Sequence, residues 1–363
     1  MGPFAKGETT KGEGPRFTGE PSCASSSCHG GGTGKDQCII WQKKDVHTSA
    51  PAILGATRSA QIAKSLGITD ATKDVRCTVC HNPLQSLPAP RFAPSEKEMR
   101  DKGVSCETCH GPAEGWLRFH TRLDITHEQR MGAGMREMRS LYDRANVCVA
   151  CHLNVSAELV GAGHPEMFFE LDGQSGAQPP HWKDRENDVW EGPRAWLVGQ
   201  AVDLRELSWR LASTPADTKL AARVKGLHWL LEQVPLGTAN LREGDASNPK
   251  GIQAGADRLA HAATREKWSK DSASALMLKL AQANEAFRDA SVPVDEQLRR
   301  AQVLALALDR LWTALKANQA VPQKTLEDSL KLVAGLAKEQ GGFDAQKFAG
   351  ALQQVEVAIV RKE

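Results

Sequence analysis

The C-terminal half of the chain has the regular apolar spacing of amphipathic helices. Leu220, Val224, Leu227, Leu231 and Val234 follow one another at intervals of four, three, four and three residues. This spacing places them along one face of a helix. The same pattern recurs twice in full and three times in shorter form. These stretches are 298–315, 348–359, 194–212, 255–288 and 324–338.

Helix-breaking residues separate these stretches. Proline or glycine stands at 235–237, 291–293, 321–322 and 341–342, where it favours a turn. About six helices joined by short turns favour an antiparallel bundle, which we expect over residues 191–363. The segment 214–217, Thr-Pro-Ala-Asp, precedes the first long stripe. It is typical of an N-cap followed by proline at the first helical position.

The N-terminal half lacks this periodicity. Residues 1–22 are rich in Gly, Pro, Lys and Glu and predict a flexible lead-in. Residues 23–190 are dense in Gly, Pro and short polar runs, with brief helical patterns at 56–66 and 131–146. Such a segment cannot bury enough of its own side chains to form an ordinary core. The pattern as a whole predicts a mainly α protein, in which a loop-rich domain with short helices precedes the helical bundle.

Composition narrows the class of protein. The chain has 46 lysine and arginine residues against 44 aspartate and glutamate residues, and this balance gives no reason to expect a nucleic-acid partner. No run of about 18 apolar residues occurs, so we expect no membrane span in this chain. Residues 1–7 lack the charged and apolar parts of an export leader, and we therefore expect a mature or truncated chain.

Three copies of one short motif lie between Cys77 and His152. Each reads Cys-x-x-Cys-His, the attachment signature of a c-type haem. The two cysteines can reach the vinyl groups of one porphyrin, and the adjacent histidine then binds the iron as its proximal ligand. The cysteines are Cys77, Cys80, Cys106, Cys109, Cys148 and Cys151, and the proximal histidines are His81, His110 and His152.

A wider copy of the motif precedes these three. Four residues separate Cys23 from Cys28, and His29 follows directly. We predict a fourth attachment site here, with His29 as the proximal ligand. The alternative is a disulfide between Cys23 and Cys28, or one that involves Cys38. We interpret Cys38, the odd cysteine, as a small buried apolar residue; an intermolecular disulfide and a part in the widened attachment site are its other interpretations.

The predicted cofactors are therefore four haem c groups, which would supply the apolar mass that residues 23–190 lack. Thioether attachment needs reduced cysteines and takes place outside the cytoplasm, so we expect a periplasmic or otherwise extracytoplasmic protein. The propionates and ferric irons of four haems would together add a net charge of roughly −4. An acidic domain of this kind favours redox partner proteins that are basic at the docking face.

The remaining histidines determine whether each iron has a second imidazole ligand. A second imidazole would leave no open position on the iron, whereas a missing one would leave a site for a substrate or a small gas. Glycine and proline near His164 and His181 would let the backbone approach a porphyrin closely. His228 and His261 fall in predicted helices and are interpreted as structural or exposed. The seven candidates are His47, His120, His127, His164, His181, His228 and His261.

The motif run and its neighbours resemble the multihaem cytochrome c-554 family and its c-554-like relatives. The resemblance rests on the pattern WxxxxxH after the first motif, GVSCETCHGPAEGWLRFH around the third and GAGHPEMFFEL after the fourth. It covers roughly residues 20–210. Relatives of this kind are periplasmic electron carriers whose haems stack closely. The resemblance implies His47, His120 and His164 as distal ligands, with His181 as the fourth.

Two departures from the family pattern affect this prediction. The first attachment motif is widened by two residues, and the helical half contains no further Cys-x-x-Cys-His. The family also includes proteins with one five-coordinate iron. Two alternatives therefore remain for His181: it is the sixth ligand of its iron, or that iron is five-coordinate. His127 is an alternative sixth ligand; its other interpretation is a surface residue near the start of the predicted 131–146 helix.

The sequence thus predicts a tetrahaem cytochrome that relays single electrons between redox partners. No acid–base pair, nucleophile or substrate cradle lies beside the predicted haem sites. We therefore predict no catalytic residues and expect a carrier more than an enzyme. One alternative is a haem enzyme that acts on nitrogen oxides or hydroxylamine at a five-coordinate iron. The other is a subunit of a larger electron-transfer complex that assembles through the helical domain.

Overall fold

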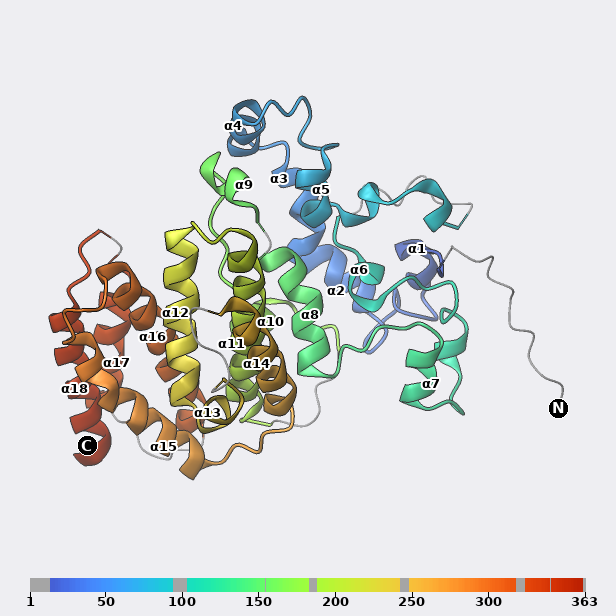
Figure 1. Cartoon of the computed structure of the whole chain (residues 1–363). Coiled ribbons are helices and arrows are strands. Elements are labelled where there is room, and N and C mark those ends of the chain that lie inside the picture. The colour runs from blue at the N-terminus through green and yellow to red at the C-terminus, as the bar shows by residue number, and fades with distance from the viewer. Residues whose placement is uncertain are drawn as a thin grey trace. The chain divides into compact units, whose positions relative to one another are not determined.

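The computed structural model describes residues 14–93, 103–153, 155–182, 188–241, 248–317, 324–339 and 341–361. The chain divides into two compact units (Figure 1). Unit 1 comprises Met1–Phe168 and Ser175–Asp184, and unit 2 comprises Phe169–Gln174 and Arg185–Glu363. The predicted turn at 321–322 and the first 13 residues of the predicted lead-in lie outside the described residues.

Helices supply the regular structure of both units. Within the described ranges, strand-like pairing is confined to an isolated bridge between Phe17 and Phe92. The predicted mainly α fold class is therefore confirmed. Among the described residues, no helix is long and apolar enough to cross a membrane.

Unit 1 contains short helices separated by loops. Several of them begin at capping side chains; for example, Asp74 accepts a hydrogen bond from the N–H of Arg76, and Ser140 accepts one from the N–H of Asp143. The α-helices of this unit are α1 (Glu20–Cys23), α2 (Gln37–Lys44), α3 (Ala50–Ile53), α4 (Thr57–Ser65), α5 (Val75–His81), α6 (Cys106–His110), α7 (His127–Gly132), α8 (Leu141–His152) and α9 (Ala157–Gly161). Helix α10 (Leu171–Ala177) begins in the segment assigned to unit 2 and ends in unit 1. The 3-10 helices among the described residues of this unit are η1 (Val46–Ser49), η2 (Pro83–Ser86), η3 (Ala89–Arg91) and η5 (Phe119–Thr121).

One of the two helical patterns predicted in this half is wrong. Helix α4 corresponds to the pattern at 56–66, but the pattern at 131–146 is divided between α7 and α8. Gly134 lies between them with φ of 104°. A residue with this backbone angle cannot continue a right-handed helix. The glycine therefore overrides the apolar spacing of its neighbours.

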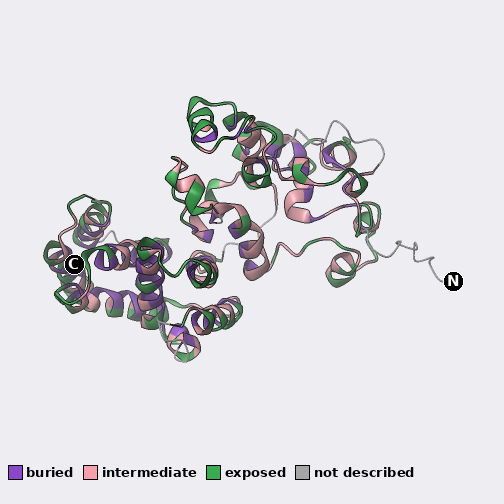
Figure 2. Ribbon diagram, turned by 45° about the horizontal axis from the view of Figure 1, so that its top comes forward, coloured by how far each residue is buried: buried purple, intermediate pink, exposed green. Residues whose placement is uncertain are grey.

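Unit 1 buries its apolar side chains in small groups. One cluster joins Phe17, Leu84 and Phe92, and another joins α4 to the segments before and after it through Leu54, Ala63, Ile68 and Ala71. In Figure 2, much of unit 1 is of intermediate or high exposure, whereas buried residues run along the helices of unit 2. Such small clusters agree with the expectation that the side chains of this segment do not form an ordinary hydrophobic core by themselves.

Unit 2 consists of longer helices whose apolar faces pack together. All five residues of the stripe from Leu220 to Val234 are buried. Helix α11 packs on α14, α12 on α16, and α17 on α18. The helices are α11 (Glu191–Ser213), α12 (Thr218–Gln233), α13 (Pro235–Leu241), α14 (Pro249–Ala263), α15 (Lys270–Ala281), η6 (Gln282–Phe287), α16 (Val294–Ala317), α17 (Lys324–Leu336) and α18 (Ala345–Arg361).

The start of α12 differs from the prediction. Asp217 is the N-cap, and its carboxylate accepts a hydrogen bond from the N–H of Leu220 at 2.9 Å. Thr214 instead ends α11, because its N–H and hydroxyl both donate to the carbonyl of Arg210. Pro215 consequently lies in the turn between the two helices and not at a first helical position.

The segment Phe169–Gln174 packs inside unit 2. Phe169 and Leu171 are almost completely buried. The guanidinium of Arg310 on α16 contacts the carboxylate of Glu170 at 2.8 Å and that of Asp172 at 3.0 Å. Apolar burial and a partly buried charge cluster together hold this short segment against the helices.

Candidate haem sites

The predicted iron ligands of unit 1 come together in four pairs. Each pair consists of one histidine from an attachment motif and one of the predicted distal histidines. The ring centroids are 6.1 Å apart for His29 and His120, 6.4 Å for His81 and His164, 6.5 Å for His110 and His181, and 6.0 Å for His152 and His47. Each pair therefore joins two histidines that are far apart in the sequence. The distance between the two ring centroids is nearly the same in all four pairs.

This separation is suitable for two imidazoles on opposite sides of one iron. A bond between a first-row metal and an imidazole nitrogen is about 2 Å long, and that nitrogen lies about 1 Å from its ring centroid. Two rings on one iron should thus have centroids roughly 6 Å apart, which agrees with all four pairs. The donor set therefore fits a haem iron with two axial histidines at each site.

Hydrogen bonds from Nδ1 fix the tautomer of six of these imidazoles. A carbonyl or carboxylate oxygen can only accept, so Nδ1 must carry the proton and Nε2 is left free to bind a metal. The acceptors are the carbonyls of Ala50 for His81 (3.1 Å), Trp116 for His120 (3.1 Å), Pro165 for His164 (2.8 Å) and Pro179 for His181 (3.4 Å), the side-chain oxygen of Gln37 for His29 (3.0 Å), and the carboxylate of Asp45 for His47 (2.8 Å).

Burial keeps three of the proximal imidazoles neutral. It lowers the pKa of His110 to about 4 and also lowers the pKa of His81 and of His152. A neutral imidazole is the form that binds a metal ion, because its free nitrogen keeps its lone pair. These histidines are therefore ready to bind iron at neutral pH without first losing a proton.

Short helices present the three regular motifs. Helices α5, α6 and α8 each end at the histidine of a motif, so the two cysteines and that histidine occupy the last helical turns. Residues three and four positions apart share one side of a helix. The spacing Cys-x-x-Cys-His thus places both sulfurs and the imidazole on one side, where a single porphyrin could reach all three.

The widened first motif reaches a similar arrangement through a turn. Helix α1 ends at Cys23, and the N–H of His29 returns to the carbonyl of Cys23 at 3.1 Å. The two extra residues are accommodated in this turn. Gly30 follows it closely, since an added Cβ there would lie 1.9 Å from the carbonyl oxygen of Ala24. A glycine is needed for the chain to pass so near its own backbone.

The cysteine sulfurs bring attachment motifs next to one another. The sulfur of Cys106 lies beside those of Cys23 and Cys38, and the sulfurs of Cys80 and Cys151 lie beside each other. All nine cysteines are free thiols in this structure. The first and third attachment sites therefore adjoin, and so do the second and fourth. Cys38 is buried, as expected, and lies in the first of these groups.

Burial and these sulfur contacts change the thiol acidities. Burial raises the pKa of Cys109 to about 12 and raises that of Cys148. The hydrogen bond with Cys106 lowers the pKa of Cys23, and the hydrogen bond with Cys151 lowers that of Cys80. Cysteines of different motifs thus differ in their environment before any thioether forms.

Glu107, inside the third motif, was not predicted as a site residue. Its carboxylate is buried and accepts hydrogen bonds from the backbone N–H groups of Thr18, Gly19 and Ala113. Burial nevertheless raises the pKa of Glu107. These bonds tie the segment that leads into Cys23 to the helix of the third motif. The sequence gives no signal of this contact beyond an acidic residue between two motif cysteines.

Asp45 was also missed by the sequence-based predictions. It is buried, its Oδ1 accepts from Nδ1 and from the backbone N–H of His47, and its Oδ2 accepts from Gln178 at 3.0 Å. Burial alone would raise the pKa of Asp45, but the hydrogen bonds from His47 and Gln178 outweigh it and hold the pKa at about 2. The available signal was an aspartate two residues before a candidate ligand, a spacing typical of a local side-chain turn.

Three other histidines lie outside the four pairs. Nε2 of His127 contacts the carboxylate of Glu137, so this nitrogen is engaged elsewhere. His228 on α12 is buried beside Glu232, and His261 on α14 is exposed. The structure therefore gives the alternative sixth ligand, His127, a carboxylate partner instead of an imidazole one.

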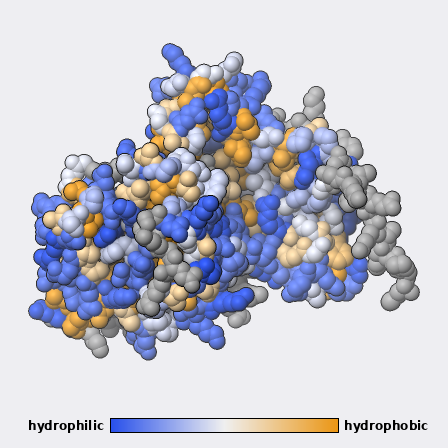
Figure 3. Space-filling view, in the orientation of Figure 1, coloured by the Kyte–Doolittle hydropathy of each residue, from blue (hydrophilic) through white to orange (hydrophobic). Residues whose placement is uncertain are grey.

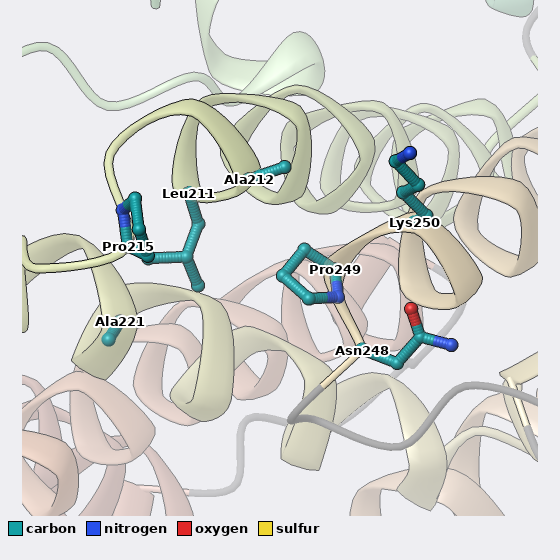
Figure 4. A pocket seen from close by; sticks show the side chains of 7 residues that line it. All are labelled: Leu211, Ala212, Pro215, Ala221, Asn248, Pro249 and Lys250. Carbon is teal, nitrogen blue, oxygen red and sulfur yellow. The ribbon is translucent and has the colours of Figure 1, made fainter.

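Unit 2 has a surface hollow of its own, of about 450 Å³ (Figure 4). It is lined by Leu211, Ala212, Pro215, Ala221, Asn248, Pro249 and Lys250. The lining is mostly aliphatic and contains none of the predicted haem residues. On the face drawn in Figure 3, hydrophobic residues form small patches within a largely hydrophilic surface.

Comparison with known proteins finds a family match over part of the chain. Residues 22–111 match the family described as cytochrome c554 and c-prime, which confirms the resemblance seen in the motifs. These residues contain the first three attachment motifs. Searches of curated proteins and of solved structures found no match. The family match supports a haem-based role in electron transfer and implies covalently bound haem c.

Proposed function

Because residues 22–111 match the cytochrome c554 and c-prime family, we propose that this protein is a tetrahaem electron carrier. It would accept and deliver single electrons between redox partner proteins in a periplasmic or other extracytoplasmic compartment. The observation that carries the proposal is the set of four imidazole pairs with nearly equal centroid separations.

Each proposed site draws two cysteines and two histidines from this chain. When bound, haem iron supplies one-electron oxidation and reduction. The proposed sets are Cys23, Cys28, His29 and His120; Cys77, Cys80, His81 and His164; Cys106, Cys109, His110 and His181; and Cys148, Cys151, His152 and His47. Of the four proposed distal ligands, the family match includes only His47, so the assignment of the other three depends on the geometry.

The protein side chains favour a carrier over an enzyme. Two imidazoles would hold the iron from both sides and leave no open position for a substrate. Their Nδ1 hydrogen bonds keep the rings in one orientation, so the ligand set need not change when an electron arrives. Little rearrangement of the protein during each transfer is what a relay requires.

The adjoining sulfurs support transfer from one site to another. The nearness of Cys23 to Cys106, and of Cys80 to Cys151, would put the proposed sites in two neighbouring pairs. Short steps between neighbouring cofactors favour rapid transfer. The chain itself contributes this closeness by bringing motifs that are remote in sequence together.

The remaining parts of the proposal concern organisation and partners. We assign residues 1–22 as a lead-in, 23–190 as the tetrahaem domain and 191–363 as an antiparallel helical bundle. Haem propionates would make the tetrahaem domain acidic and favour a basic docking face on its partner. The helical domain, which lacks cysteine, would serve in docking or in assembly into a larger complex.

Haem counting and spin state test the proposal. We expect four haems per chain by pyridine haemochrome assay, together with low-spin ferric absorption and electron paramagnetic resonance (EPR) spectra. Removing one distal ligand with His164→Ala should convert one of the four irons to high spin. His261→Ala, at an exposed position of unit 2, is the matched control and should leave the spectrum unchanged.

Two outcomes would contradict a tetrahaem carrier. One is fewer than four haems in the purified protein. The other is a substantial high-spin signal in the unmodified protein that responds to nitrite, hydroxylamine or nitric oxide.

The second outcome would favour an enzyme with an open iron at the third site. One observation favours this alternative: among the Nδ1 hydrogen bonds given above, that of His181 is the longest, at 3.4 Å. His181 also belongs to the pair with the largest centroid separation, 6.5 Å. If any distal imidazole is displaced by a substrate, this one is held least firmly.

A further inference from the structure

We propose that Asp45 gives the site between His47 and His152 the lowest reduction potential of the four. The inference rests on the proposed tetrahaem function and adds the place of this site in the order in which the four sites are reduced. An electron entering the fully oxidised protein would occupy this site last, and an electron leaving it would have the largest driving force. Asp45 acts through His47, so it is a positioning residue and not an iron ligand.

The carboxylate of Asp45 is fixed at both of its oxygens. Oδ1 accepts a hydrogen bond from Nδ1 of His47 at 2.8 Å and another from the backbone N–H of His47 at 3.0 Å. Oδ2 accepts from the side-chain amide of Gln178 at 3.0 Å. The carboxylate side chain has no exposed surface. Asp45 is therefore aimed at His47 and shielded from water.

This contact should change the electron density at the other ring nitrogen. A buried carboxylate draws the Nδ1 proton toward itself and makes the imidazole a stronger donor through Nε2. A stronger donor stabilises ferric iron more than ferrous iron, and this lowers the reduction potential. The low dielectric around a buried pair strengthens the effect.

Five of the other imidazoles have weaker acceptors. Among the hydrogen bonds that the described residues make to the eight paired histidines, Asp45 supplies the single carboxylate acceptor. The rest are backbone carbonyls and the neutral amide of Gln37. Hydrogen bonds to an ionised acceptor are roughly twice as strong as those between neutral groups. Nδ1 of His110 is buried and has no partner among the described residues.

Asp45→Asn tests the inference with little change in shape. Asparagine keeps an oxygen for both bonds from His47 but removes the negative charge. In a redox titration of the purified tetrahaem protein, followed by absorbance and EPR, the lowest potential should rise clearly more than the other three. A tenfold loss of preference for ferric iron corresponds to about 59 mV for a one-electron couple.

Gln37→Glu is the reciprocal variant. Gln37 is the first residue of α2 and accepts from Nδ1 of His29. A glutamate there would place a carboxylate on a second site, and the first turn of a helix tolerates negative charge. We expect a second potential to fall toward that of the His47 site, with the low-spin spectrum retained.

The outcomes separate this inference from the proposed function. If both variants keep four low-spin haems and the potentials do not move, the inference about Asp45 is wrong and the tetrahaem proposal stands. If the unmodified protein lacks four low-spin haems, the proposed function fails first. If Asp45→Asn does not load haem, Gln37→Glu decides alone, and an unchanged set of potentials overturns the inference.

Discussion

Each paired imidazole is oriented at the residue scale by the acceptor of its Nδ1 proton. His120 turns toward a carbonyl one helical turn earlier in its own chain segment, whereas His47 turns toward a carboxylate two residues before it. The acceptor fixes the plane of the ring as well as its tautomer. Ring orientation is therefore set locally, and it differs between the four sites.

The ring planes predict two kinds of EPR signal. The planes of His29 and His120 lie only 17° apart, whereas the other three pairs are inclined at 64° to 82°. Parallel rings act on the same iron d orbital and separate the two π-bonding orbitals, but perpendicular rings leave them nearly equal in energy. We expect one rhombic ferric signal and three strongly anisotropic signals with a large highest g value.

A variant can assign the rhombic signal. His120→Ala should remove it and leave the three anisotropic signals in place. Four signals of one kind, or loss of an anisotropic signal in this variant, would contradict the ring orientations.

At the element scale, close helix contacts in unit 2 depend on small residues. An added Cβ at Gly199 on α11 would lie 2.8 Å from Cβ and 2.9 Å from N of Leu171. We expect Gly199→Ala to destabilise unit 2 by about 1–3 kcal/mol, because the packed segment must move. Thermal unfolding followed by circular dichroism would measure this.

Gly350 on α18 is the matched control. An added Cβ at this position meets nothing within 4 Å among the described atoms. Gly350→Ala should stabilise the helix by about 0.5–1 kcal/mol, because alanine loses less backbone entropy. Equal effects of the two variants would show that the approach of Leu171 to α11 is not tight.

Helix α11 also carries a buried acid that makes stability depend on pH. Burial raises the pKa of Asp203 to about 7, against the opposing charges of Arg223 and Arg210 and with a contribution from Glu206. An unfolded aspartate has a pKa of 3.8. Between these values the folded chain holds one proton more than the unfolded chain, so its stability falls as pH rises from about 4 to about 7.

Asp203→Asn should remove this pH dependence. The variant should unfold at a higher temperature than the unmodified protein near pH 8, with a much smaller difference near pH 4. The gain is at most about 4 kcal/mol, the equivalent of the full pKa difference. A difference that is the same at both pH values would show that Asp203 does not titrate in this range.

The whole molecule combines two units with different sources of stability. Unit 2 buries long apolar stripes between helices, and residues such as Trp196 and Phe287 are completely covered. Unit 1 has small apolar clusters and many cysteines and histidines of intermediate exposure. Stability in unit 1 should therefore depend on bound cofactor much more than in unit 2.

Removing haem should then unfold one unit selectively. The full chain, produced without haem attachment, should lose the helices of unit 1 and keep those of unit 2. Limited proteolysis should leave a resistant fragment close to residues 191–363, with a cooperative thermal transition. A resistant fragment that includes residues 77–152 would mean that unit 1 folds on its own side chains.

Some of this protein could be predicted because the relevant information is local. The attachment motifs are recognisable since one porphyrin requires two cysteines and a histidine at fixed short spacing. The helices of unit 2 are recognisable since a buried face repeats at the helical period, as from Leu220 to Val234. Prediction failed where one residue overrode the pattern, as Gly134 did in the 131–146 stretch and Asp217 did at the start of α12.

The sequence by itself determined that this chain is mainly α and carries the residues of c-type haem attachment. Only the tertiary structure decided which histidines face each other, that Asp45 is directed at His47, and that Glu107 joins two motifs. These contacts connect loops and helices far apart in the chain, or depend on which way a side chain turns. Local spacing does not specify either, because both follow from how the segments pack.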